Sequence, residues 1–250
     1  MALLALITDL HANREAVEAV LADARIKGAE RFAFLGDFVG YGADPGWVVD
    51  TVRAMVNQGA LAVMGNHDLA VVQGSNMQHN MVPQARQVAE WTRSQLDARQ
   101  LDFLASLPMS VVDKSCLFVH ANAFAPAEWR YIQTRLDAVR SLQSTDCRYT
   151  FCGHVHEPKL YHVGGSGHSG EFNPTPDIPI PLSRHRQWLA LPGSAGQPRD
   201  GNPAASYALF DLASSTLTFQ RVLYDHDTTA AKILAAGLPA RLAHRLSLGV

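Results

Sequence analysis

The sequence holds 250 residues, of which 47% are hydrophobic and 18% charged, with a formal net charge of −2. This is the composition of a globular protein, and the charge gives no electrostatic basis for bulk nucleic-acid or membrane binding. No apolar run reaches the roughly 20 residues of a membrane-spanning helix. Three cysteines form neither a disulfide framework nor a zinc-type spacing. We expect one domain over residues 1–250, in the reducing environment of the cytoplasm.

The first 64 residues predict strands that alternate with helices. Residues 2–8, 31–35 and 61–64 are short apolar runs without alternation, which is typical of buried strands. A helix is expected over residues 14–27, where apolar residues recur every three or four positions. A second helix is expected to begin at Asp44-Pro45, because aspartate is a common N-cap and proline is favoured in the first turn.

The rest of the chain predicts a helical middle and a second half rich in strands. Residues 68–107 have few strand signals, so we expect helices there that cover the site and select substrates. Residues 164–185 are rich in glycine, serine and proline and predict a loop. Further strands are expected at about residues 110–112, 116–120, 149–152, 188–191, 206–211 and 216–222, and further helices at 135–142 and within 228–248.

Polar residues that can bind metal ions follow five of the predicted strands. In α/β folds the carboxyl ends of strands are where ligands bind. In an extended turn, alternate residues project the same way, so D-x-H and H-x-H would each present two ligands to one small volume. The five segments are Asp9-Leu10-His11, Gly36-Asp37, Gly65-Asn66-His67-Asp68, Val119-His120 and Gly153-His154-Val155-His156.

The ligand types of this set favour a catalytic metal centre. Imidazole, carboxylate and amide without thiolate suit two ions of manganese, iron, zinc or similar metals better than a structural zinc site. Gly65 frees the backbone for a sharp, left-handed turn. Taken alone, residues 65–68 could equally form a surface turn, because glycine and asparagine are common turn formers. The five segments together favour the metal centre.

The ordered series resembles the motifs of the calcineurin-like metallophosphoesterase superfamily. Residues 192–201 and Ala205-Ser206-Tyr207 resemble its bacterial and archaeal phosphodiesterase-like branch. The resemblance implies an α/β fold in which two mixed β-sheets pack as a sandwich with helices on the outer faces. Ala12 and Ala121 stand where the family commonly has glycine, and each adds a methyl group near the site.

The resemblance also implies the roles of the site residues. A hydroxide that bridges the two metal ions would attack phosphorus, and His67 would protonate the leaving oxygen while Asp68 orients its ring. Because a carboxylate has two oxygens, Asp37 could bridge both ions. The implied ligands are Asp9, His11 and His156 for one ion, Asn66, His120 and His154 for the other, and Asp37 for both.

Three further residues are candidates for substrate binding. Asn13 lies at the start of the first helix, whose amino end suits a phosphate. Tyr41 could stack on a substrate base or simply pack. Arg199 could contact phosphate, although an arginine in a loop is often solvated.

The implied activity is hydrolysis of phosphate mono- or diesters, either small molecules or phosphoproteins. Some relatives cleave dinucleoside polyphosphates, and that alternative requires a base-stacking wall near the metals, for which Tyr41 and Trp91 are the sequence hints. A non-catalytic interaction scaffold, as in one retromer subunit that resembles the superfamily, predicts lost ligands or loss of His67. All of these residues are present.

Overall fold

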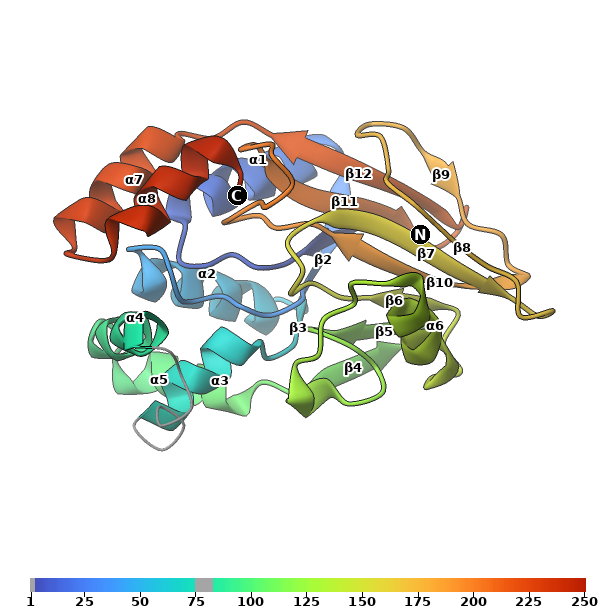
Figure 1. Ribbon diagram of the computed structural model, residues 1–250, viewed down its shortest axis with the longest axis horizontal. Coiled ribbons are helices and arrows are strands. Elements are labelled where there is room, and N and C mark those ends of the chain that lie inside the picture. Colours follow the sequence, from blue (N-terminus) through green and yellow to red (C-terminus); the bar gives the residue numbers. More distant parts are fainter. Residues whose placement is uncertain (1–2, 75–82) are drawn as a thin grey trace.

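Two six-stranded sheets pack face to face in the computed structural model, which describes residues 3–74 and 83–250 (Figure 1). The first sheet has the order β3-β2-β1-β11-β12-β9 and the second β4-β5-β6-β10-β7-β8. The strands of the first sheet are β1 (Leu3–Ile7), β2 (Ala29–Phe34), β3 (Leu61–Ala62), β9 (Ile180–Pro181), β11 (Ala205–Asp211) and β12 (Thr216–Val222). Those of the second are β4 (Ser110–Asp113), β5 (Cys116–Val119), β6 (Tyr149–Phe151), β7 (Pro158–Gly164), β8 (Ser169–Phe172) and β10 (Arg186–Pro192).

Both sheets are mixed, as the resemblance implies. In the first, β1, β2 and β3 are parallel and β1 pairs antiparallel with β11. In the second, β5, β6 and β10 are parallel and β10 pairs antiparallel with β7. The carboxyl ends of the parallel strands therefore meet at one edge of each sheet, which is where the predicted ligands follow.

The position of β1 between two cores explains why its sequence does not alternate between apolar and polar residues. Leu4 and Leu6 pack into the core between the two sheets, whereas Ala5 and Ile7 pack into the core under the helices. Successive side chains of a strand point to opposite faces, so a central strand with both faces buried must be apolar throughout.

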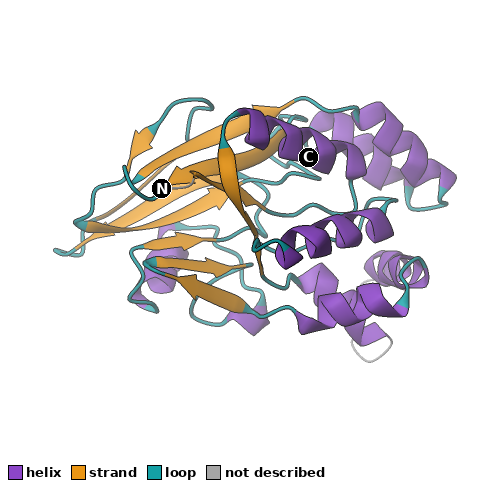
Figure 2. Ribbon diagram, turned by 180° about the vertical axis from the view of Figure 1, so that it is seen from behind, coloured by secondary structure: helices purple, strands orange, loops and turns teal. Residues whose placement is uncertain are grey.

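Helices cover the outer faces and gather at one end of the molecule (Figure 2). Helix α1 (Arg14–Ile26) and α2 (Pro45–Asn57) pack on the first sheet, and α6 (Arg135–Gln143) packs on the second. Helix α4 (Pro83–Ser94) shares a smaller core with α7 (His226–Ala235) and α8 (Ala240–Leu248). The remaining elements are α3 (Asn66–Gln73), α5 (Ala98–Ser106) and a 3₁₀ turn at Pro126–Glu128.

The predicted fold class is confirmed, with three local differences. The predicted loop at 164–185 contains β8, which pairs with β7, and β9, which pairs with β12. These segments are strands because neighbours pair with them, whereas Gly170 in β8 and Pro181 in β9 weaken the strand signal of the sequence. The third strand is only two residues long, and α3 begins directly at Asn66.

The predicted role of residues 68–107 as a substrate-selecting cover stays a prediction. Part of that range, residues 75–82, lies outside the described residues. Trp91 on α4 packs beside Val88 and the α7–α8 pair, together with Tyr41. Trp91 therefore contributes to a core, which is the packing role that competes with substrate contact.

Candidate metal centre

The turns that carry the candidate ligands have an unusual backbone. Five of these residues have φ in the left-handed region, which non-glycine residues adopt at a cost of about 1–3 kcal/mol each. The motifs D-x-H and H-x-H are therefore not in the extended conformation that the sequence predicts. Such strain persists where the surrounding structure holds it, and it gathers at functional sites. The φ values are 53° for Asp9, 47° for His11, 53° for Asp37, 69° for His154 and 68° for His156.

These turns bring the candidate ligands together in two groups that share one residue. Within each group, one nitrogen or carboxylate oxygen from every member lies within 4.8 Å of the others. His156 lies in a different group from His154, so the H-x-H motif divides between the two groups. The first group is Asp9, His11, Asp37 and His156, and the second is Asp37, His120 and His154.

The facing atoms lie at distances that leave room for an ion between them. In the first group, the Nε2 atoms of His11 and His156 are 3.1 Å apart, and His156 Nε2 is 3.2 Å from Asp9 Oδ1. In the second, His120 Nε2 lies 3.1 Å from the amide oxygen of Asn66. Asn66 thus joins the second group, as the sequence predicts for its position, although its role as a ligand stays a prediction.

A backbone carbonyl holds the other nitrogen of each of these four imidazoles. His11 Nδ1 contacts the Val39 carbonyl at 3.2 Å, and His120 Nδ1 contacts the Leu35 carbonyl at 2.7 Å. His156 Nδ1 contacts the Gln197 carbonyl at 2.6 Å, and His154 Nε2 contacts that of Trp129 at 2.9 Å. A carbonyl only accepts, so each contacting nitrogen is the protonated one. In the neutral imidazole the opposite nitrogen keeps its lone pair, which is how metal-binding histidines are usually oriented.

The two carboxylates are held so that one oxygen of each faces the histidines. Asp37 Oδ2 lies 3.3 Å from His120 Nε2 and 3.9 Å from His11 Nε2, while its Oδ1 accepts the backbone N–H of His67 at 2.8 Å. A bridge through Asp37 would therefore use Oδ2 alone rather than one oxygen for each ion. In Asp9, Oδ2 accepts the Thr8 hydroxyl at 2.8 Å and Oδ1 faces the imidazoles.

Because the groups of this cluster are buried, their charges interact strongly and shift one another's pKa. Burial opposes the charged form of Asp37, but the imidazoles of His120 and His67 hold its pKa well below the usual value. Burial likewise opposes charge on His120, yet the Asp37 carboxylate raises the His120 pKa to about 9. Burial and the nearby His120 lower the pKa of His154 to about 4, so its imidazole is neutral at pH 7.

Metal ions fit this donor set. Ionisable groups as deeply buried as these are normally paired or bound to metal, because an uncompensated buried charge is costly. Lone pairs of His11 and His156 face each other without a proton donor between them, an arrangement that a cation relieves. Imidazole with carboxylate and amide oxygen suits first-row transition metals. Both groups could therefore hold an ion.

Gly65 is required by close approach rather than by a left-handed turn. Its φ is −100° and its ψ is 171°, so the predicted left-handed conformation is wrong. A Cβ atom at this position would lie 2.2 Å from both the backbone nitrogen and Oδ1 of Asp37. Only glycine lets these two turns touch, and the contact positions Asp37.

Asp68 does not orient the His67 ring. It lies at the third position of α3 and is fully buried, and its two oxygens accept four backbone N–H groups. Oδ2 accepts from Asp37 and Gly65, both at 2.9 Å. Oδ1 accepts from Phe38 at 2.9 Å and Val39 at 3.2 Å. Asp68 therefore ties the Asp37 turn to the start of α3, which corrects the predicted contact.

His67 lies beside the cluster without belonging to either group. Its ring centroid is 5.1 Å from that of His11 and 4.5 Å from that of Tyr41. Burial lowers the pKa of its imidazole, against the attraction of Asp37. The ring is therefore within reach of a molecule that sits on the cluster, and its role as an acid stays a prediction.

Asn13 is buried and its side chain already has partners, which argues against the predicted contact with substrate. Its Oδ1 caps α1 by accepting the backbone N–H of Ala16 at 3.1 Å, and it also accepts the Thr229 hydroxyl at 3.0 Å. Its Nδ2 donates to the Gly196 carbonyl at 2.7 Å. Asn13 thus joins α1 to the loop after β10 and to α7.

Tyr41 and Arg199 lie at the edge of the cluster, as substrate-binding residues would. The Tyr41 ring is 4.5 Å from the His11 ring, and the Arg199 guanidinium is 5.8 Å from the Tyr41 ring. The Arg199 backbone N–H donates to the His156 carbonyl at 3.3 Å. Their binding roles stay predictions.

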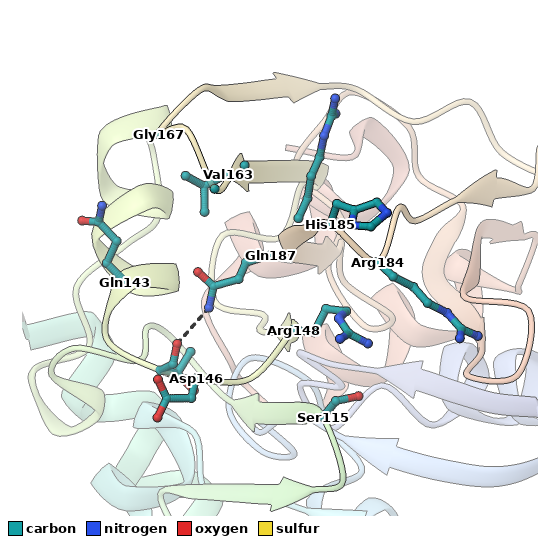
Figure 3. Close-up of a pocket in the computed structure, with 13 residues that line it drawn as sticks. Ser115, Gln143, Asp146, Arg148, Val163, Gly167, Arg184, His185 and Gln187 are labelled. Carbon is teal, nitrogen blue, oxygen red and sulfur yellow. Dashed lines mark hydrogen bonds between the residues drawn. The ribbon is translucent and has the colours of Figure 1, made fainter.

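A separate cavity of about 660 Å³ lies away from these groups (Figure 3). Ser115, Arg148 and Arg186 line it, at the amino ends of β5, β6 and β10. The candidate ligands His120 and His154 follow the opposite ends of β5 and β6. The cavity contains none of the predicted site residues.

Two supporting contacts carried little sequence signal. The Ser194 hydroxyl donates to the Asp9 carbonyl at 2.8 Å and accepts the Gln197 N–H at 2.8 Å. It therefore links the turn of Asp9 to Gln197, whose carbonyl contacts His156. The Tyr131 ring stacks on His154 with centroids 4.0 Å apart and planes 12° apart. Residues 192–197 could have been found through their family-like motif, whereas Tyr131 lies in a loop without a pattern.

This fold, with buried imidazoles and carboxylates at its strand ends, matches the architecture that the sequence resemblance implies. A family model described as the calcineurin-like phosphoesterase superfamily domain matches residues 2–215, and the chain belongs to this superfamily. The predicted superfamily is thereby confirmed. No helix in the described ranges is long and apolar enough to cross a membrane.

Similar proteins come from bacteria and archaea. A metallophosphoesterase from Sphaerobacter thermophilus is 36% identical, with a TM-score of 0.88 over 100% of this chain and 99% of that chain. An uncharacterized protein of Methanocaldococcus jannaschii is 34% identical over 99% of this chain and 98% of its own length. A hypothetical protein from Pyrococcus horikoshii shares the fold, with a TM-score of 0.80 at 17% identity over 100% of this chain and 99% of that chain.

Proposed function

We propose that this protein hydrolyses phosphate esters at a centre of two metal ions. The observation that carries the proposal is the pair of ligand groups that share Asp37, in which a backbone carbonyl orients each imidazole. Membership of the calcineurin-like phosphoesterase superfamily supports it. Manganese, iron and zinc all suit this donor set.

Each of the two ligand groups would hold one ion. Asp9, His11 and His156 would hold one ion, Asn66, His120 and His154 the other, and Asp37 both. When bound, the ions would supply Lewis acidity toward the phosphoryl oxygens and lower the pKa of water. The carbonyls behind the imidazoles keep these side chains in place through the reaction.

His67 would donate a proton to the leaving oxygen. Its position beside His11 and Tyr41, outside both ligand groups, leaves the ring free for this role. Asp68 supports the reaction indirectly, because it holds the backbone of Asp37 and of Gly65.

Arg199 and Tyr41 would bind the ester at the edge of the cluster. The guanidinium lies over the Tyr41 ring, so both are placed to contact an anionic group. Small-molecule mono- or diesters and phosphoproteins remain the expected substrates, and the cytoplasm the expected compartment. A scaffold without activity is not proposed, since all candidate ligand residues and His67 are present in the sequence.

Hydrolysis of an ester by manganese-loaded protein tests the proposal. The His154→Ala variant should lose one ion and at least about 99% of activity, because one ligand group is broken. His185→Ala is the control, since this exposed histidine belongs to neither ligand group. Equal activity of metal-free and metal-loaded protein would contradict the proposal, as would a fully active His154 variant.

A further inference from the structure

The loop between β5 and α6 is held firmly beside the second ligand group. Asn122 is fully buried, donates through Nδ2 to the Arg130 carbonyl at 3.0 Å and accepts the Ala125 N–H at 2.8 Å. Ile132 is buried in the core under α6 and anchors the far end of the loop. These contacts fix the backbone of residues 129–131, so a side chain from this stretch has a defined position.

Tyr131 uses this position to place an aromatic ring at the metal centre. The ring stacks on the imidazole of His154, yet 45% of the residue is exposed. The exposed part lines a cavity of about 510 Å³, which is within the size range of small-molecule sites. The cavity is also lined by Ile132, Gln133, Val155, Glu157, Lys159, Tyr161, Leu191 and Arg199.

Arg199 connects this cavity with the position of the proton donor. Its guanidinium lies 5.8 Å from the Tyr41 ring, which in turn lies 4.5 Å from His67. Arg199 thus lies both in the cavity lining and next to the aromatic ring that borders His67. Arg199 Nε has no hydrogen-bond partner among the described residues, whereas its Nη2 donates to the amide oxygen of Gln197 at 3.0 Å.

The lining favours a planar ring with polar groups over a purely aliphatic substituent. Tyr131 and Tyr161 supply aromatic surface, and Gln133 supplies an amide. Lys159 Nζ lies 3.7 Å from a carboxylate oxygen of Glu171. Arg199, the other cation of the lining, has no carboxylate within 4.0 Å among the described residues. Flat aromatic rings stack well on such a surface, and arginine adds a cation–π contact.

We propose that this cavity receives the leaving group of the ester and that Tyr131 selects leaving groups with a planar aromatic ring, the class to which nucleosides belong. This inference rests on the proposed hydrolase function. The stacking wall that a nucleotide substrate needs is then Tyr131, rather than Trp91, which packs beside α7 and α8.

A matched pair of substrates tests the inference. 2-Phenylethyl phosphate and 2-cyclohexylethyl phosphate have similar size and similar alkoxide leaving groups, and differ in the aromaticity of a remote ring. Manganese-loaded wild type should prefer the phenyl ester by about tenfold in kcat/KM, the size of one stacking contact. Tyr131→Leu keeps apolar bulk and should reduce the preference to about twofold or less. Tyr131→Phe keeps the ring and should retain the preference.

The control is Phe172→Leu, which removes another exposed aromatic ring, on β8 and outside the cavity. It should leave the preference unchanged. Because the readout is the ratio of kcat/KM for two substrates, a general loss of activity affects both values and cancels. The metal content of each variant shows whether His154, on which Tyr131 stacks, still binds its ion. Equal hydrolysis of both esters by wild type, or an undiminished preference in Tyr131→Leu, overturns the inference and leaves the proposed function standing. If manganese-loaded protein hydrolyses neither ester nor any other phosphate ester, both proposals fail.

Discussion

The role of Asp68 can be tested by replacing it with asparagine. Each carboxylate oxygen accepts two backbone N–H groups, so an amide can serve only one pair. The amide NH₂ would face the other two N–H groups, either those of Asp37 and Gly65 or those of Phe38 and Val39. Leaving two buried donors unpaired costs about 2–6 kcal/mol, at about 1–3 kcal/mol each.

Removal of the charge offsets part of this cost. Burial and the neighbouring Asp37 carboxylate raise the pKa of Asp68 to about 7, so the charged form is itself disfavoured. We therefore expect a loss in the lower half of the range, about 2–4 kcal/mol of unfolding free energy. Metal affinity should fall as well, because the turn that carries Asp37 loses its support.

Urea denaturation of metal-free protein measures this loss without the stabilisation that bound metal adds. The control is Asp102→Asn on the exposed face of α5, which should stay within about 0.5 kcal/mol of wild type. If Asp68→Asn kept wild-type stability and metal content, and lost activity only toward poor leaving groups, Asp68 would orient the His67 ring after all.

Three other variants test Asp37 as a shared ligand, His67 as the general acid and Asn13 as the cap of α1. Asp37→Asn should lose at least one metal equivalent and most activity, since one oxygen faces both groups, and retention of both ions by elemental analysis would refute the shared role. His67→Ala should keep both ions but hydrolyse alkyl phosphates about 10²–10⁴-fold more slowly, with a smaller loss on nitrophenyl phosphate; equal losses would argue against a general acid. Asn13→Ala should cost about 1–2 kcal/mol in urea denaturation through the lost cap of α1, with KM for a small ester unchanged; a raised KM at wild-type stability would restore its substrate contact.

The sequence was sufficient for most of the elements, with β7, β8 and β9 as exceptions, and for the candidate ligands at the strand ends. Strand β1 is recognisable because both faces are buried, so its residues are apolar throughout. His120 follows β5 directly and His154 lies three residues beyond the end of β6, and topology then brings those strand ends together. A buried run followed by a polar turn is a local pattern, which one sequence can display.

Contacts between distant segments could not be predicted. The partners of Asp68 at residues 37–39 lie about thirty positions away, and the local sequence favoured its neighbour His67 instead. The need for glycine at position 65 arises from the Asp37 turn across the same gap. Tyr131 belongs to a loop whose shape depends on the buried Asn122, and loops of this kind have no periodicity to detect.

The proposed function depends on two metal ions that share the Asp37 carboxylate. Manganese titration of metal-free protein, followed by electron paramagnetic resonance, tests it most directly. Two equivalents should bind, and because ions that share one carboxylate lie about 3.5–4 Å apart, their spectrum should show exchange coupling. The rate of ester hydrolysis should rise together with the exchange-coupled signal as manganese is added. Binding of a single ion, or two uncoupled ions in a fully active enzyme, would contradict the account.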